Sequence, residues 1–142
     1  MSSATVFLDV NVWVALAWVT HAHHSTAKEW FDSLVDQEPV FCRFTQMGLL
    51  RLLTTEAVMG PEVLTQRQAW SVYDSFLQDS GARFIYETRT LDDSFRKLSR
   101  LDTASPKDWA DSYLAAFALE AGARLVTFDK ALAGRVKGSV AL

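Results

Sequence analysis

The sequence predicts an α/β fold: a three-layer sandwich in which helices cover both faces of a mostly parallel sheet of four to five strands. Short apolar runs of strand length alternate along the chain with segments of helical periodicity, and this alternation is typical of right-handed β–α–β units. No internal repeat, low-complexity tract or linker interrupts it, and 142 residues is a usual length for one domain. We therefore expect a single domain over residues 1–142.

The first quarter of the chain predicts one strand followed by two helices. The apolar run Thr5–Leu8 is a candidate strand, and residues 11–18 behind it have the length and composition of a short buried helix. Apolar residues then recur at helical spacing from Ala27 to Val35, and Ser25 is a candidate N-cap for that helix.

The middle of the chain repeats this order. Pro39 is expected to break the chain ahead of a second strand at Val40–Cys42. Thr45 is the expected cap of a strongly apolar helix, and Gly60-Pro61 marks a turn. A long amphipathic helix follows, with one apolar face over residues 69–77.

The last third has the clearest element boundaries. Ser105 fits an N-cap, Pro106 the first helical position and Asp108 the acid of a capping box. Gly122 fits the residue just past the end of that helix. The elements expected in this third are a strand at 84–86, a helix at 90–101, a helix at 106–121, a strand at 124–127 and a short strand at 140–142.

Composition limits the class of protein. Five Trp and nine Phe among 49% hydrophobic residues argue against disorder, and a formal net charge of −3 is not typical of a protein that binds nucleic acid by bulk charge. The apolar stretch 10–19 is too short and too interrupted to span a membrane, and residues 1–4 offer no basic start of a secretory leader. A single cysteine allows no internal disulfide. We expect a cytoplasmic protein without a membrane segment.

Three acids are expected to meet at one edge of the sheet. Asp9 follows the first strand, Asp129 follows the strand at 124–127, and the carboxyl ends of parallel strands share an edge. Asp111 lies in the second turn of the helix at 106–121, which begins at the same edge. Carboxylates that meet there repel each other unless a cation or a proton lies between them. The pattern predicts a Mg²⁺ or Mn²⁺ site of the kind that activates water against a phosphodiester.

Two amides are candidates to support this site. Asn11 lies two residues past Asp9 and can orient a carboxylate or a metal-bound water. Gln46 lies in the first turn of the helix after the second strand and can do the same.

Each candidate also has a plain structural interpretation. Asp9 and Asp129 are common N-cap residues, Asp111 could be a solvated helix residue, and Asp108 could act only as a helix cap. The histidines His21, His23 and His24 lack a second group of ligands elsewhere, which favours a polar helix start over a zinc site.

Four segments in this order resemble the PIN domain and, within it, a VapC-type toxin ribonuclease: Phe7–Val12, Thr45–Leu53, Trp109–Ala116 and Gly122–Asp129. The resemblance covers essentially the whole chain. It implies a Mg²⁺- or Mn²⁺-dependent endoribonuclease, a homodimer, and inhibition by a co-expressed VapB-type antitoxin. The acids of the family carry over onto Asp9, Asp111 and Asp129.

This chain departs from the family pattern at two positions. Gln46 stands where many members have an acid, so we expect weaker metal affinity or a single metal, and Asp108 could supply the missing charge. Val10 stands where a Thr is common, which removes a hydroxyl. The alternative function is a non-catalytic RNA-binding or protein-interaction module. An aspartyl-phosphate phosphatase is disfavoured because that chemistry needs an acid where the chain has Asn11.

Overall fold

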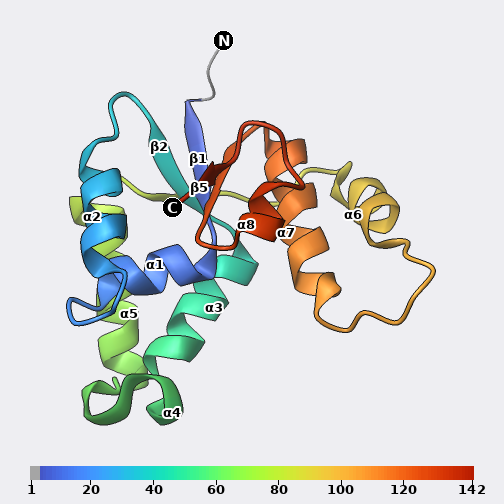
Figure 1. Cartoon of the computed structure of the whole chain (residues 1–142). Coiled ribbons are helices and arrows are strands. Elements are labelled where there is room, and N and C mark those ends of the chain that lie inside the picture. The colour runs from blue at the N-terminus through green and yellow to red at the C-terminus, as the bar shows by residue number, and fades with distance from the viewer. Residues whose placement is uncertain (1–3) are drawn as a thin grey trace.

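The computed structural model describes residues 4–142, so the first three residues, which we considered for a secretory leader, lie outside it. Five parallel strands form one sheet, and helices pack on both of its faces (Figure 1). The strands are β1 Thr5–Leu8, β2 Glu38–Phe41, β3 Arg83–Phe84, β4 Arg124–Thr127 and β5 Val140–Ala141. The helices are α1 Val10–Ala17, α2 His24–Asp32, α3 Arg43–Leu53, α4 Glu56–Met59, α5 Gln66–Asp79, α6 Leu91–Ser99, α7 Asp108–Ala121 and α8 Lys130–Ala133, with a 3₁₀ turn η1 at Gly60–Glu62.

The strand order is β3-β2-β1-β4-β5, with β1 at the centre. Strand β1 pairs with β2 on one side and with β4 on the other, where Leu8 lies opposite Val126. The predicted three-layer α/β class with a parallel sheet is confirmed. That residues 1–142 form one domain stays a prediction.

Alternating side chains of β1 supply the two cores. Val6 and Leu8 pack under α1, α2, α3 and α5, whereas Phe7 packs under α6, α7 and α8. On the first side Trp13 stacks on Phe41 with ring centroids 3.8 Å apart, and on the second Phe7 meets Phe117 at 4.7 Å. Figure 1 separates the same two helix groups on either side of the sheet.

Strand β2 includes Pro39, so the prediction that this proline breaks the chain was wrong. Glu38 donates its N–H to the Ala4 carbonyl beside β1, so the next residue faces the opposite neighbour. Strand β3 begins its pairing only at Val40 opposite Arg83. The missing N–H of Pro39 therefore lies ahead of β3 and removes no hydrogen bond from the sheet.

Three helix starts also differ from the predictions. Helix α2 has His23 as its N-cap, so Ser25 is a first-turn residue. Helix α3 begins after Cys42, whose N–H donates to the Thr45 hydroxyl at 3.0 Å, so Thr45 supports the start from inside the helix. Ser105 belongs to a turn ahead of α7: its carbonyl accepts the N–H of Asp108 at 3.0 Å.

Within residues 4–142, no helix combines the length and the apolar character that crossing a bilayer requires.

Candidate active site

Asp9 lies at the carboxyl end of the central strand and is nearly buried, with 9% of its surface exposed. Its backbone N–H donates to the Val126 carbonyl at 2.9 Å, which ties it to β4. Its carboxylate accepts the N–H of Val10 at 2.7 Å and the hydroxyl of Thr127 at 2.7 Å. Both the helix-cap and the edge-of-sheet interpretations of Asp9 therefore hold at once.

One hydroxyl connects the two acids that follow the strands. The Thr127 Oγ1 atom donates to Asp9 and accepts the backbone N–H of Asp129 at 3.0 Å. The Asp129 carboxylate in turn caps α8 by accepting the N–H groups of Ala131 at 2.9 Å and Leu132 at 3.2 Å. We did not predict a role for Thr127, because a β-branched residue at the end of an apolar run is ordinary strand composition.

The third acid, Asp111, belongs to the same electrostatic group. Burial raises the pKa of Asp9, the hydrogen bonds from Thr127 and Val10 partly offset this, and repulsion from Asp111 and Asp129 raises that pKa further. Burial and then repulsion from Asp129 raise the pKa of Asp111. Asp111 and Asp129 thus disfavour ionisation of Asp9, and Asp129 disfavours ionisation of Asp111.

Their donor chemistry fits a hard divalent cation. Carboxylate oxygens are the ligands that Mg²⁺ and Mn²⁺ prefer. Two residues past Asp9, the Asn11 Oδ1 atom is buried and has no hydrogen-bond partner within residues 4–142, at a cost of about 1–3 kcal/mol. Within residues 4–142 no three His, Cys, Asp or Glu side chains already stand in a metal-binding arrangement. Metal binding by Asp9, Asp111 and Asp129 therefore stays a prediction.

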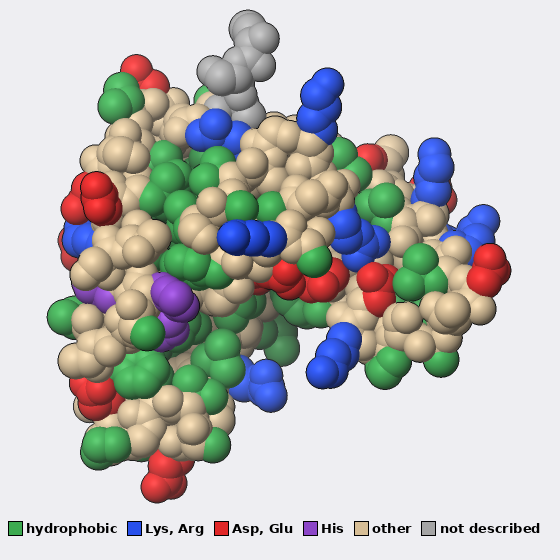
Figure 2. Space-filling view, in the orientation of Figure 1, with side chains coloured by type: hydrophobic (Ala, Val, Ile, Leu, Met, Phe, Trp, Pro, Cys, Tyr) green, Lys and Arg blue, Asp and Glu red, His purple; other side chains and the backbone are tan. Residues whose placement is uncertain are grey.

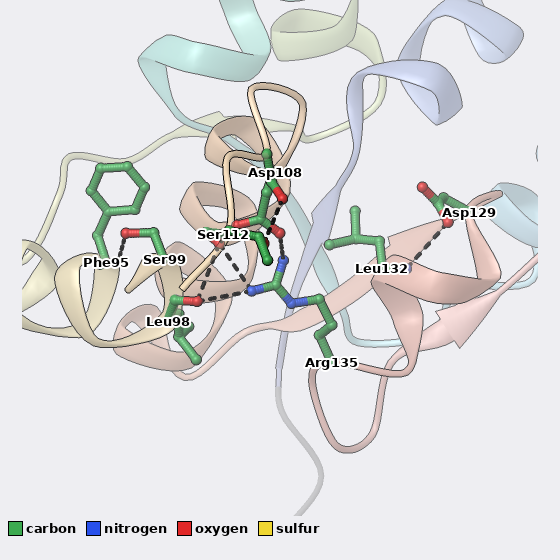
Figure 3. Close-up of polar contacts among 10 residues, drawn as sticks. Phe95, Leu98, Ser99, Asp108, Ser112, Asp129, Leu132 and Arg135 are labelled. Carbon is green, nitrogen blue, oxygen red and sulfur yellow. Dashed lines mark hydrogen bonds and ion pairs between the residues drawn. The ribbon is translucent and has the colours of Figure 1, made fainter. Parts of the chain in front are cut away.

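Asp108 is held by a network around Arg135 (Figure 3). Arg135 pairs with Asp108 at 2.8 Å and donates to the Ser112 hydroxyl at 2.9 Å and the Leu98 carbonyl at 3.2 Å. Ser112 donates to the second oxygen of Asp108 at 2.6 Å. The predicted capping-box role of Asp108 was therefore wrong, because the distant Arg135 binds one of its oxygens and Ser112, one turn along α7, binds the other. Its charge is matched by Arg135, which leaves little support for Asp108 as a replacement for the acid absent at Gln46.

Arg135 thereby joins two acid-bearing segments. Arg135 lies just after α8, whose N-cap is Asp129. Its side chain pairs with Asp108 in the first turn of α7, the helix that carries Asp111. The guanidinium also opposes the rise in the pKa of Asp111.

Gln46 is buried and its amide is committed to neighbouring side chains. Its Oε1 atom accepts a hydrogen bond from Arg43 at 2.6 Å. Burial raises the pKa of Tyr73, and a hydrogen bond with the Gln46 side chain partly offsets this effect. That Gln46 orients a metal-bound water stays a prediction.

The three histidines serve local structure. His21 Nδ1 accepts the N–H of His23 at 3.0 Å, and His24 Nδ1 lies 2.7 Å from the Ala15 carbonyl. His23 stacks on Phe128 with ring centroids 4.8 Å apart. These contacts agree with a polar helix start.

Charge is unevenly distributed over the face that Figure 2 shows. Acidic side chains gather near its middle, below α7 and α8, and Lys and Arg side chains flank them on both sides. A concentration of acid within a basic surround suits a cation-dependent site for a polyanion.

The PIN domain family model matches residues 6–137. Ribonuclease VapC41 of Mycobacterium tuberculosis is 42% identical over 130 residues, which cover 87% of this chain and 88% of that protein.

Two solved structures show the same fold. The crystal structure of VapC20 from Mycobacterium tuberculosis, described as a toxin that cleaves the sarcin-ricin loop, aligns with a TM-score of 0.64 at 19% identity over 91% of this chain and 93% of that one. VapBC2 from Rickettsia felis, solved with a DNA fragment from its promoter, aligns with a TM-score of 0.63 at 14% identity over 97% of each chain. The family-model match and the identity to VapC41 place this chain in the PIN-domain family, in its VapC group.

Proposed function

We propose that this protein is a metal-dependent endoribonuclease that acts as the toxin of a type II toxin–antitoxin pair. Two observations support the proposal: Asp9 and Asp129 follow the paired strands β1 and β4, and repulsion from Asp111 and Asp129 contributes to the raised pKa of Asp9. The 42% identity to a ribonuclease of the VapC group supports RNA as the substrate.

In this proposal Asp9, Asp111 and Asp129 hold Mg²⁺ or Mn²⁺. Such an ion lowers the pKa of a bound water and stabilises charge on the phosphodiester under attack. The carboxylates match its preference for oxygen ligands. Because Gln46 brings no charge, three acids rather than four form the site, and we expect weak metal affinity.

The remaining residues of the site position these acids. Thr127 orients the Asp9 carboxylate and fixes the backbone of Asp129 through one hydroxyl. Arg135 anchors the first turns of α7 and so sets the place of Asp111. That Asn11 orients a carboxylate or a metal-bound water stays part of the proposal; its Oδ1 atom is buried and has no hydrogen-bond partner among the described residues.

The proposed partners follow from membership in the VapC group. A VapB-type antitoxin would hold the toxin inactive, and the alignment with VapBC2 from Rickettsia felis supports a partner of that kind. We also propose a homodimer. RNA cleavage as a toxin activity requires access to cellular RNA, so we place the protein in the cytoplasm.

The test is cleavage of RNA by the purified chain with Mg²⁺ or Mn²⁺, together with mapping of new RNA 5′ ends after expression in a bacterium. We expect cleavage and growth arrest, and we expect Asp9→Asn or Asp129→Asn to abolish both while the circular dichroism spectrum is unchanged. An undiminished cleavage rate in either purified variant would defeat the catalytic claim.

A non-catalytic RNA-binding or protein-interaction module is the second candidate. One observation favours it: the position where many relatives carry an acid holds Gln46, and that amide is bonded to Arg43. Calorimetric titration separates the two functions. Binding of Mg²⁺ or Mn²⁺ at millimolar concentration that Asp129→Asn removes supports the enzyme, and no binding supports the module.

A further inference from the structure

Four aromatic rings form a continuous row at the edge of the sheet that carries the acids. Phe44 at the start of α3 lies 5.3 Å from Tyr113 of α7, Tyr113 lies 5.9 Å from Phe95 of α6, and Phe95 lies 6.2 Å from Trp109 of α7, measured between ring centroids. We call these four residues the aromatic row. Its two ends reach the surface: Phe44 is 39% and Trp109 is 59% exposed.

The aromatic row shares helix α7 with one of the proposed catalytic acids. Trp109 and Tyr113 are one turn apart on α7, and Asp111 lies between them in sequence, on a different side of the helix. An α-helix with its side chains is about 10–12 Å across. A strand of nucleic acid that reaches Asp111 can therefore also reach the row around the first turns of α7.

Arginines accompany both ends of the row. At the Trp109 end, a groove of about 360 Å³ is lined by Phe95, Trp109, Arg96 and Arg100 together with Asp92 and Ser99. Arg96 is paired with Asp92 at 2.7 Å, whereas Arg100 forms no ion pair within the described chain. At the other end the Arg43 guanidinium lies over the Phe84 ring at 4.7 Å.

This combination is typical of surfaces that bind single-stranded nucleic acid. Every base has a π-face that can stack on an aromatic side chain, and nearby arginines contact the phosphates. An apolar protein helix seated in the same groove would bury the guanidinium of Arg100 without an acidic partner from this chain, which is costly. The phosphates of a nucleic acid would supply the negative charge that pairs with Arg100.

We propose that the aromatic row is a base-binding subsite for single-stranded RNA, in which Trp109 stacks on a base and Arg100 contacts a phosphate. The proposal rests on RNA as the substrate of the site above. It assigns substrate affinity to the α6–α7 side of the molecule and leaves cleavage to the acids.

Binding is best measured with the Asp9→Asn variant, which does not consume the RNA. The probe is a fluorescently labelled, single-stranded, mixed-sequence RNA 12-mer, followed by anisotropy. We expect Trp109→Ala in this background to weaken binding about 5- to 100-fold, the range expected for one lost stacking contact. Trp109→Phe, which keeps an aromatic face, should retain most of the affinity.

A matched control is available in Trp70 of α5. It is 46% exposed and lines a separate groove with Met47, on the helices that cover the other face of the sheet. Trp70→Ala should leave RNA binding unchanged.

The role of Arg100 is tested by the salt dependence of RNA binding. Arg100→Ala should reduce the slope of log affinity against log salt by about 0.7, as expected for one lost phosphate contact on a single strand. Exposed Arg67 of α5 is the charge-matched control, and its replacement by Ala should leave that slope unchanged.

The outcomes separate this proposal from the one it rests on. If the Asp9→Asn protein binds the RNA and Trp109→Ala binds equally well, the aromatic row is not a subsite, although RNA can remain the substrate. If Trp109→Ala changes the oligomeric state of the protein and leaves its RNA affinity unchanged, the aromatic row belongs to a protein interface. That result would also overturn the subsite. If the Asp9→Asn protein binds no RNA although the original protein cleaves it, the subsite is overturned and RNA remains the substrate; if the original protein neither binds nor cleaves RNA, both proposals fail.

Discussion

The two halves of the candidate site are built in different ways. In the sheet half, Asp9 and Asp129 follow the paired strands β1 and β4, and the Thr127 hydroxyl lies between their segments. In the helix half, Asp111 stands on α7, which is reached through residues 100–107, nearly all of them exposed. The side chain of Arg135 joins the first turns of α7 to the segment behind Asp129 through its contacts with Asp108 and Ser112.

This difference shows which interactions position each of the three acids. Backbone pairing in a buried parallel sheet positions the first two acids, and their hydrogen bonds are local refinements. The third acid depends on a clamp between side chains that are 27 residues apart. Substitutions in the sheet half should therefore affect the whole fold, and substitutions in the helix half should loosen the start of α7, with Asp111, more than the sheet.

The largest effect is expected from Thr127→Val, which is nearly isosteric and removes the shared hydroxyl. Asp9 would lose a buried hydrogen bond to its carboxylate, and Asp129 would lose the acceptor for its N–H. We expect a loss of about 2–3 kcal/mol in the free energy of unfolding, measured by urea denaturation, since hydrogen bonds to charged groups contribute that much. Thr127→Ser keeps the hydroxyl and should recover most of the loss. Equal stability of the Val variant and the original protein would remove Thr127 from the site.

Gly48→Ala tests the packing that supports the sheet half. A Cβ atom at this position of α3 would lie 2.5 Å from Cγ2 of Val10, the residue directly after Asp9. We expect a loss of about 1–3 kcal/mol in thermal or urea unfolding, because overpacking in a close contact forces neighbours apart. The double variant Val10→Ala with Gly48→Ala should be more stable than Gly48→Ala alone. Additive losses in the double variant would show that the contact between α1 and α3 is not the cause.

Arg135→Ala tests the helix half. The side chains of Arg135 and Asp108 are 27% and 22% exposed, so this ion pair is only partly screened by water. We expect a loss of about 1–2 kcal/mol in global stability, and a larger increase in hydrogen exchange at the start of α7 than in β1 and β4. The control is Arg83→Ala, which breaks a pair that is 59% and 40% exposed and should cost no more than about 0.5 kcal/mol. Uniform exchange across sheet and helix would contradict the division into two halves.

The smallest effect is a gain in stability from Asp9→Asn in the absence of divalent ions. Asn keeps the shape and an acceptor for the Val10 N–H, its NH2 group can donate to the Thr127 hydroxyl in a reversed hydrogen bond, and it removes a buried charge that Asp111 and Asp129 repel. The melting temperature at neutral pH should therefore rise, while cleavage is lost. A lower melting temperature would mean that the hydrogen bonds of the carboxylate outweigh its burial and repulsion.

The sequence predicted the sheet half better than the helix half for a physical reason. Apolar runs followed by Asp9 and Asp129 mark strand ends directly, because period and burial are local properties of the chain. The same patterns placed Asp111 correctly on its helix. They missed the role of Thr127 because its hydrogen bond to Asp9 is made across the sheet, between residues far apart in the chain.

The errors fall where tertiary partners override local signals. Asp108 has the spacing of a capping box, yet Arg135 and Ser112 take both of its oxygens. Pro39 looks like a strand breaker, yet it is tolerated because its missing N–H faces no paired strand. Such outcomes depend on which residues of distant segments meet, and no local pattern contains that information.

The most direct test of a shared cation is anomalous diffraction from crystals of the protein soaked in Mn²⁺. Convergence of the three acids predicts a single strong Mn²⁺ peak at ligand distance, or one water away, from the carboxylates of Asp9, Asp111 and Asp129, absent in the Asp129→Asn variant. A peak elsewhere, or none at this edge of the sheet at millimolar Mn²⁺, would contradict it.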